Sequence, residues 1–449
     1  MRIAIKKFKS GERYVFLLDD DGLPDFWVTH FVTQKLRTRK AATSIEQYLK
    51  SIKHLKTWES INGRDLLDEI YAGTVPNTHD INALKEHCAY QTKVFKQRPK
   101  ADVVDMAAFY LSKTQDKPTV TKSQYVSRVA HIAEYLHFCG EERVKNKPAA
   151  AQLVDALAAM KKRLKSDMPR GRLKRQPQSL DKSGIADEVF EDFVAVAKIN
   201  SKDNPFSNPV IKLRNYLIVQ TLYETGFRRS ELIALRISDI GTETDQPTLS
   251  VICRHNSKED PRLDEPTAKT LSRTLPISKE LRDLLNYYVR SCRSQTKSAR
   301  THPFVFVSHK DKIGSHESGQ PIVKQTVNDV FNRIRKVNSE RFWGITPHVY
   351  RHFFNDQLSS CIDEINATVK LEAMRLETEG KREEAKLYAN DNIITEQREL
   401  EIRAELNGHS SLESGRIYLK RTLKKQTSEF RTKMYAKLKH KVEGGIYGR

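Results

Sequence analysis

The chain places a histidine and an arginine at a helix start that suits an anion. Thr346 followed by Pro347 is typical of a helix N-cap and first helical residue, so a helix is expected to begin there. His348 and Arg351 then share one face of its first turns. Free backbone N–H groups and the helix dipole favour an anion such as a phosphate at that end. With 14 histidines in the chain, roughly one His-x-x-Arg pattern is expected by chance, so this motif alone is weak.

A second segment pairs an arginine with a glutamate. Gly226 is typical of a helix end, and the next expected helix places Arg228 and Glu231 one turn apart. The pair is either part of a functional site or an ordinary ion pair on a helix surface. The segment by itself favours neither interpretation.

A third segment places a histidine and a tyrosine around another helix start. Ser410 and Glu413 form the Ser-x-x-Glu pattern of a capping box, so a helix is expected just after Gly408-His409. Tyr418 then lies about two turns along it. A single tyrosine on a helix is far more often a core or surface residue than a nucleophile, so Tyr418 indicates little in isolation.

The joint order of these segments is more informative than any one of them. The chain carries T-G-x-R-x-S-E-L, then a lysine in an expected β-hairpin, then H-x-x-R, then G-H, and a tyrosine nine residues after that histidine. This order, over about residues 210–420, resembles the tyrosine recombinases, the phage integrase family. The catalytic set that the resemblance implies is Arg228, Lys269, His348, Arg351, His409 and Tyr418.

The resemblance also implies a role for each side chain. Arg228 and Arg351 are expected to hold the non-bridging oxygens of a DNA phosphate, and Glu231 is expected to orient Arg228. Guanidiniums suit this task because each presents fixed N–H donors and stays charged. Tyr418 is expected to attack phosphorus in line and form a 3′-phosphotyrosyl enzyme, with His348 assisting proton transfer.

The lysine of the hairpin has two candidates. Residues 266–276 resemble the K-T-x-x-R-x-x-P stretch of several integrases, which favours Lys269 as the general acid for the departing 5′ oxygen. Lys258, in the preceding turn, is the alternative, and an exposed loop lysine is the ordinary interpretation of both. His409 matches a position that the family fills with His or Trp.

The expected reaction uses no metal and no cofactor, because a phosphodiester is exchanged for a phosphotyrosine of similar energy. The sequence contains no Walker loop and no Cys, His or carboxylate cluster with metal-ligand spacing. Its 5 cysteines are scattered without a C-x-x-C pair, as is typical of a reducing cytoplasm.

The charge of the chain points to a polyanionic partner. Among 449 residues, 78 Lys+Arg against 57 Asp+Glu leave a net charge of +21 at pH 7. Nucleic acid and an anionic membrane are the leading partners for such a surplus. Charges at the N-terminus disfavour a signal peptide, and no run of about 18 apolar residues appears, so no membrane partner is expected. We expect a bacterial cytoplasmic, nucleoid-associated protein.

We expect an α+β fold, mostly α, with a helical core-binding (SAM-like) domain and a mixed α/β catalytic domain holding a small antiparallel sheet. The expected parts are a β-hairpin appendage at 1–30, a helical DNA clamp at 31–165, a basic linker at 166–184 and the catalytic domain at 185–449. Basic residues in and before the linker are expected to contact DNA phosphates, although a merely solvated linker is the alternative. These residues are Lys161, Lys162, Arg163, Lys165, Arg170, Arg172, Lys174 and Arg175.

Two segments of the expected catalytic domain stand out by charge. Residues 362–406 hold 12 acidic and 7 basic residues, so DNA should repel them and a helical hairpin is expected to project from the duplex. This insertion is either solvated without a role or a contact for another protomer or an accessory protein. Residues 419–449 form a basic tail, which the resemblance implies docks on a neighbouring protomer.

The leading hypothesis is a site-specific DNA recombinase or integrase of a mobile element, acting as a tetramer on double-stranded DNA. A type IB topoisomerase-like enzyme that relaxes DNA is one alternative. A DNA-binding protein that keeps the fold without cutting is another, and the complete set of catalytic residue types argues against it.

Overall fold

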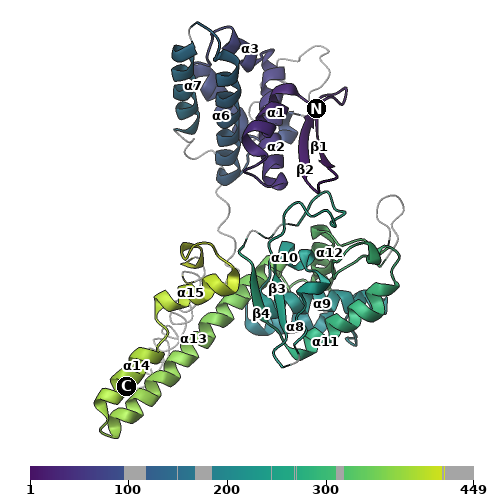
Figure 1. Ribbon diagram of the computed structural model, residues 1–449, viewed down its shortest axis with the longest axis vertical. Helices are drawn as coiled ribbons and strands as arrows, with labels where there is room; N and C mark the ends of the chain where they lie inside the picture. The colour runs from purple at the N-terminus through teal and green to yellow at the C-terminus, as the bar shows by residue number, and fades with distance from the viewer. Residues whose placement is uncertain are drawn as a thin grey trace, which may run out of the picture. The chain divides into compact units, whose positions relative to one another are not determined.

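The computed structural model describes residues 1–95, 118–148, 150–166, 185–243, 245–266, 268, 270–309, 318–416 and 419. The chain divides into two compact units, Met1–Leu180 and Asp181–Arg449. The expected fold class is confirmed, because most described residues are helical and the sheets are small and antiparallel (Figure 1). Apart from Ser166, the linker expected at 166–184 lies outside the described residues.

The first unit is a β-hairpin packed on helices. Its elements are β1 (Arg2–Lys7), β2 (Arg13–Leu18), α1 (Phe26–Phe31), α2 (Ala42–Asn62), α3 (Leu66–Tyr71), α4 (Thr78–Ala89), α6 (Lys122–Val144) and α7 (Ala150–Lys165). Leu49 and Ile52 of α2 and Ile132 and Leu136 of α6 are all fully buried, as helical spacing of apolar residues predicts. Leu17 of β2 is buried in the same core, so the hairpin is part of this unit.

The second unit surrounds a two-stranded sheet with helices. Its elements are α8 (Asp187–Ala197), α9 (Pro209–Thr225), α10 (Arg229–Ala234), β3 (Thr248–Val251), β4 (Arg273–Pro276), α11 (Lys279–Tyr287), α12 (Lys324–Arg335), α13 (Pro347–Thr378), α14 (Arg382–Asn392) and α15 (Glu396–Asn407). Strands β3 and β4 pair antiparallel, with Leu249 opposite Leu275.

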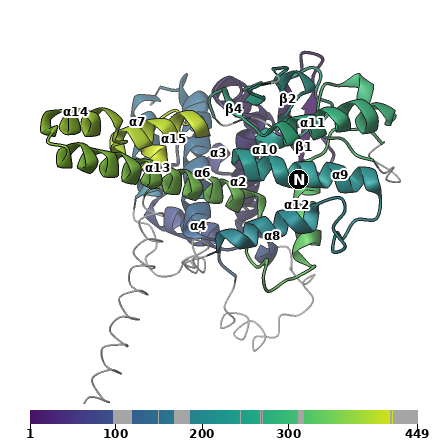
Figure 2. The same ribbon diagram turned by 90° about the horizontal axis from the view of Figure 1, so that it is seen from below.

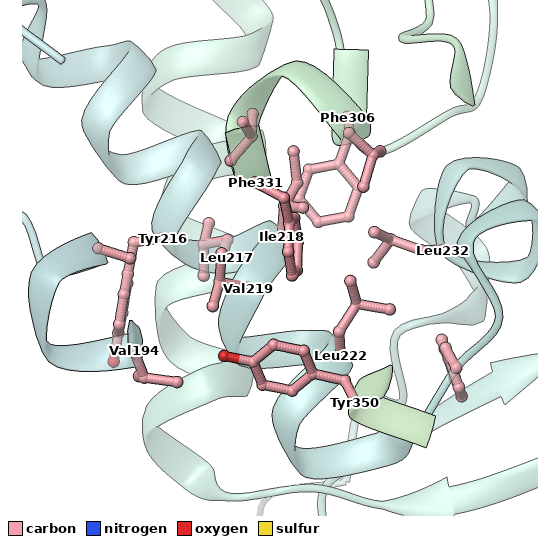
Figure 3. Close-up of a cluster of buried hydrophobic side chains, with 14 of the residues drawn as sticks. Val194, Tyr216, Leu217, Ile218, Val219, Leu222, Leu232, Phe306, Phe331 and Tyr350 are labelled. Atoms are coloured by element: carbon pink, nitrogen blue, oxygen red, sulfur yellow. The ribbon is translucent and has the colours of Figure 1, made fainter. Parts of the chain in front are cut away.

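Helix α9 runs through the centre of this unit. Leu217, Ile218, Val219 and Leu222 are all buried, so apolar side chains cover every side of the helix, as expected of a core helix. Figure 3 shows these side chains with the fully buried ring of Tyr350, which comes from the start of α13. The start of α13 is therefore anchored in the core, and this fixes the residues beside Tyr350.

The rest of α13 leaves the core. The helix runs unbroken through residue 362, where the acidic insertion was expected to begin, because neither Gly nor Pro interrupts it before Gly380. Helix α14 folds back along α13, and α15 returns the chain toward the core (Figures 1 and 2). We call residues 362–407, the second half of α13 together with α14 and α15, the projection.

Candidate active site

The end of α9 and the start of α10 place Arg228 and Glu231. Gly226 ends α9 in the left-handed region with φ 59°, and a Cβ there would lie 2.7 Å from the ring of Phe354. Only glycine fits this turn without strain. Arg228 then becomes the N-cap of α10, and its backbone N–H donates to Glu231 Oε2 over 2.9 Å.

Glu231 is the centre of a cluster of guanidiniums. Its side chain is fully buried, and its carboxylate accepts from Arg228 Nη1 at 3.2 Å and from Arg273 Nη2 at 2.8 Å. Thr270 Oγ1 also donates to Glu231 Oε1 over 2.8 Å. Burial would raise the pKa of this carboxyl, but the nearby Arg273 and Arg351 outweigh burial and hold the pKa below its ordinary value. Glu231 is therefore a carboxylate at neutral pH.

Arg351 joins the cluster from the first turns of α13. It is 1% exposed, and its Nη1 lies 3.9 Å from Glu231 Oε2. Nη1 donates to the carbonyl of Gly226 over 3.0 Å, and Nη2 donates to the carbonyl of Asn407 over 2.8 Å. The two carbonyls belong to the ends of α9 and α15, so Arg351 ties three helices together.

His409 follows the end of α15. Gly408, with φ 64°, caps that helix, and its carbonyl accepts from the backbone N–H of Leu271 over 2.9 Å. This bond ties the segment to the approach of β4. The imidazole Nε2 lies 3.5 Å from Arg351 Nη2. Burial, followed by the charges of Arg351 and Arg228, lowers the pKa of His409 to about 4, so its imidazole is neutral at pH 7.

The structure thus brings together four of the residues that the sequence singled out: Arg228, Glu231, Arg351 and His409. His348 lies on the exposed side of α13, where its ring meets that of His352 edge-on at a centroid distance of 4.7 Å. Lys258 is exposed in its loop. Lys269 and Tyr418 lie outside the described residues.

The expected DNA-contacting residues fall in the first unit or outside the described residues. Lys162, Arg163 and Lys165 are exposed and Lys161 is partly exposed in the last turns of α7. The side chain of Lys85 donates to the carbonyl of Arg163 over 2.6 Å and so caps that helix end. The other four expected DNA-contacting residues lie outside the described residues: Arg170, Arg172, Lys174 and Arg175.

Several residues that support this cluster had no role in the expectations from the sequence. Arg273 and Thr270 hold Glu231, and Asn355, Arg403 and Asn407 connect α13 with α15. Arg273 and Thr270 stand in the stretch that resembles K-T-x-x-R-x-x-P, which is a local signal for them. Asn355, Arg403 and Asn407 carry no local signal, because the contacts between α13 and α15 join residues at least 40 positions apart.

No group of three or more His, Cys, Asp or Glu side chains suited to a metal ion occurs in the part of the chain that the structure describes. Among the same residues, no helix is both long and apolar enough to span a membrane. What the cluster offers is positive charge and N–H donors. Arg228 is 29% exposed in its side chain and can turn toward a bound anion, while Glu231 prevents its guanidinium from swinging freely.

Comparison with known proteins agrees with this geometry. Residues 194–361 match the model of the phage integrase family. This range contains Arg228, Glu231, His348 and Arg351, and it ends before His409. Residues 194–361 are therefore similar to the phage integrases, the tyrosine recombinase family, and most of the arginine cluster lies within this range.

Individual relatives match only part of the chain. It is 32% identical over 146 residues to transposase A from transposon Tn554 of Staphylococcus aureus, which covers 32% of this chain and 36% of that protein. It is 27% identical over 186 residues to tyrosine recombinase XerD of Halalkalibacterium halodurans, covering 41% of this chain and 49% of the relative. The structure of the XerH site-specific recombinase bound to palindromic difH substrate aligns with 91% of this chain and 95% of that chain, at 12% identity and a TM-score of 0.42. The chain therefore spans between about a third and a half of the length of the curated relatives it matches.

Proposed function

We propose that the protein is a site-specific DNA recombinase of a mobile element, which cuts and rejoins double-stranded DNA through a 3′-phosphotyrosyl intermediate. The observation that carries the proposal is the convergence of Arg228, Arg351 and His409, from three distant segments, around the buried carboxylate of Glu231. The transposase and recombinase names of its relatives support the same function.

In this proposal, the arginines bind the scissile phosphate. Arg228 and Arg351 donate N–H groups to its non-bridging oxygens and place fixed positive charge where negative charge concentrates in the pentavalent transition state. Neutral His409 donates one further hydrogen bond from its N–H. The electrostatic stabilisation comes from groups already held by Glu231 and by backbone carbonyls, so little reorganisation accompanies the reaction.

Residues other than those of the arginine cluster make and break the bonds in this proposal. Tyr418 Oη attacks phosphorus, and the bond from phosphorus to the 5′ oxygen breaks. His348 assists removal of the phenolic proton, since a phenol with an ordinary pKa of about 10 is a poor nucleophile at neutral pH. Lys269, with Lys258 as the alternative, gives a proton to the departing 5′ oxygen. A 5′-hydroxyl of a partner duplex then reverses these steps on the phosphotyrosine.

The assembly on DNA is part of the same proposal. Four protomers act on two duplexes, the helical first unit completes a clamp around DNA, and the basic segment around residues 161–177 lies on phosphates. The basic tail at 419–449 docks on a neighbouring protomer. The excess of basic residues, +21 over the chain, supports a polyanionic partner.

A nicked suicide substrate that contains the end of the element tests the proposal. We expect a covalent protein–DNA adduct that survives denaturation, that is lost in Tyr418→Phe and that persists in the control Tyr388→Phe, a tyrosine of α14. Strand exchange between two duplexes supports a recombinase. Relaxation of supercoils without strand exchange indicates a topoisomerase-like enzyme instead, and DNA binding without any adduct overturns the catalytic proposal.

A further inference from the structure

A polar network joins the projection to the arginine cluster. On α13, Arg351, Asn355 and Ser359 are spaced four residues apart and therefore share one face. This face meets α15, the last helix of the projection. The side chains that meet there are polar and buried: Asn355 and Arg403 are both 0% exposed and Asn407 is 1% exposed.

Two amides at the centre of the network bind each other reciprocally. Asn355 Nδ2 donates to Asn407 Oδ1 over 3.1 Å, and Asn407 Nδ2 donates to Asn355 Oδ1 over 3.0 Å. Each amide also binds its own helix: Asn355 Nδ2 donates to the carbonyl of Arg351 over 2.8 Å, and Asn407 Nδ2 donates to that of Arg403 over 3.0 Å. The pair therefore fixes the distance and the register between α13 and the end of α15.

Arg403 completes the network one turn earlier on α15. Its Nη1 donates to the carbonyl and to Oδ1 of Asn355, over 3.1 Å and 3.0 Å. Its Nη2 donates to Ser359 Oγ and also, over 2.6 Å, to Glu399 Oε1. Farther along the projection, the side chain of Asn366 binds the backbone of Ile394 in both directions, at 2.9 Å and 2.8 Å.

The network ends at two groups of the candidate active site. Asn407 is the last residue of α15, and its carbonyl accepts from Arg351 Nη2 over 2.8 Å. Gly408 and His409 follow directly, and the backbone N–H of His409 donates to the carbonyl of Ala404 in the same helix end over 2.8 Å. Any shift of α15 along α13 therefore displaces one acceptor of Arg351 and moves His409 with it.

Apolar side chains of similar size would hold two helices together at least as well as this network does. Burying polar groups costs desolvation free energy. They stabilise the fold only in the geometry in which each of them forms its hydrogen bonds. Here the network specifies the position of the end of α15, where the carbonyl of Asn407 accepts from Arg351. Catalytic groups need placement to well under 1 Å, and an error of about 1 Å lowers rates by about 100-fold.

We propose that Asn355, Arg403 and Asn407 are positioning residues, which lock α15 of the projection to α13 and thereby set Arg351 and His409 against the scissile phosphate. The projection is then a support of the active site as well as a solvent-exposed extension. That these residues serve DNA cleavage rests on the proposed function. Their effect on the position of His409 can be measured in the free protein.

A double-mutant cycle separates positioning from stability. We compare Asn355→Leu, Asn407→Leu and the double variant by urea unfolding, by DNA affinity and by the single-turnover rate of adduct formation. Each single variant leaves a buried amide without its partner and should be less stable. The double variant removes both amides and should recover the stability that an unpaired amide costs, while Arg403 Nη1 keeps the Asn355 carbonyl as an acceptor. We expect the double variant to bind DNA within about twofold of wild type and to form adduct at least about 30-fold more slowly. Recovery of the rate together with the stability overturns the proposal.

A second variant and a measurement without DNA make the test independent of folding and of activity. Arg403→Lys keeps a charge near Glu399 but removes the planar fork, and we expect adduct formation about 10-fold slower with unchanged DNA affinity. Gln397→Ala, on the exposed side of α15, is the control and should match wild type. In the free protein, NMR titration should show the pKa of His409 rising from about 4 toward its ordinary value in the network variants.

An unchanged titration of His409 in all folded variants, or a rate for Arg403→Lys equal to that of Gln397→Ala, overturns the positioning role. A wild-type protein that forms no adduct contradicts the proposed function alone. The titration still decides in that case whether the network sets the position of His409.

Discussion

Replacing Glu231 by glutamine removes one charge from the centre of the arginine cluster without changing its size. The carboxylate accepts from the Arg228 backbone, from two guanidiniums and from Thr270, and it lies 3.9 Å from Arg351 Nη1. In the better of its two orientations, the glutamine amide keeps the bonds from Arg273 and from the backbone N–H of Arg228. Its NH₂ group then faces Arg228 Nη1, and the hydrogen bond between them is lost because both groups are donors.

The expected loss combines one charge-assisted hydrogen bond and the attraction for two buried guanidiniums. A hydrogen bond to a charged group contributes about 1.5–3 kcal/mol, and breaking a buried ion pair costs about 3–5 kcal/mol in total. Because Arg228 is partly exposed and can turn to water, we take the lower limit for Glu231→Gln, about 3 kcal/mol of unfolding free energy. Adduct formation should fall as well, since Arg228 loses the group that orients it.

Urea unfolding at pH 7 measures this loss, with Glu224→Gln as the matched control. Glu224 also accepts hydrogen bonds, from the side-chain amide of Gln220 and from the backbone N–H and Oγ of Ser278, but it is only partly buried, so its replacement should cost less than about 1 kcal/mol. The pKa of Glu231 is held below its ordinary value, so its contribution is present above pH 4.5 and is lost as the pH falls through the lowered pKa. The gap between wild type and Glu231→Gln should therefore narrow in acid. A gap under about 1 kcal/mol at pH 7, or one that does not depend on pH, refutes the central role of the Glu231 charge in the cluster.

Two further predictions concern the same site. The pKa of His409 is lowered to about 4, so protonation favours the unfolded chain. The unfolding free energy of wild type should therefore fall as the pH drops from 6.5, the ordinary pKa of histidine, toward 4. His409→Phe should lose that part of the pH dependence, and equal pH profiles for wild type and variant contradict the lowered pKa. Gly226→Ala should destabilise the protein by about 2 kcal/mol, because it combines a positive φ with a Cβ pressed against Phe354. Gly63→Ala is the control, because Gly63 also has a positive φ of 63° but no atom lies within 4 Å of an added Cβ. In the same urea assay it should lose only the cost of the left-handed backbone, about 1 kcal/mol. Equal losses of stability in the two variants contradict the steric contribution of Phe354.

Local signals in the sequence predicted the local parts of this structure. Thr346-Pro347 predicted the start of α13, and Gly226 predicted the end of α9, because caps and left-handed turns depend on neighbouring residues. The order of motifs predicted the similarity to the phage integrase family, whose model matches residues 194–361. The mostly helical fold also followed from it and from apolar residues at helical spacing in α2 and α6.

The parts that the sequence did not predict depend on contacts between distant residues. Arg273 reaches Glu231 across 42 residues, and Asn355 reaches Asn407 across 52. No pattern within a helix distinguishes these side chains from ordinary polar residues before the helices are packed. The acidic insertion expected from residue 362 begins within helix α13, because a change in charge along the chain does not end a helix.

The guanidinium of Arg351 is fastened to the main chain, through the carbonyls of Gly226 and Asn407. A carbonyl is present whatever side chain a residue carries, so this attachment depends on where two helices stop and on the buried network that holds the end of α15 in place. Substitution of exposed side chains outside that network can consequently change the surface around the site while Arg351 keeps its position. Attempts to redirect such a protein to new targets have the most freedom at those outer positions, and the least at the two glycines that end α9 and α15.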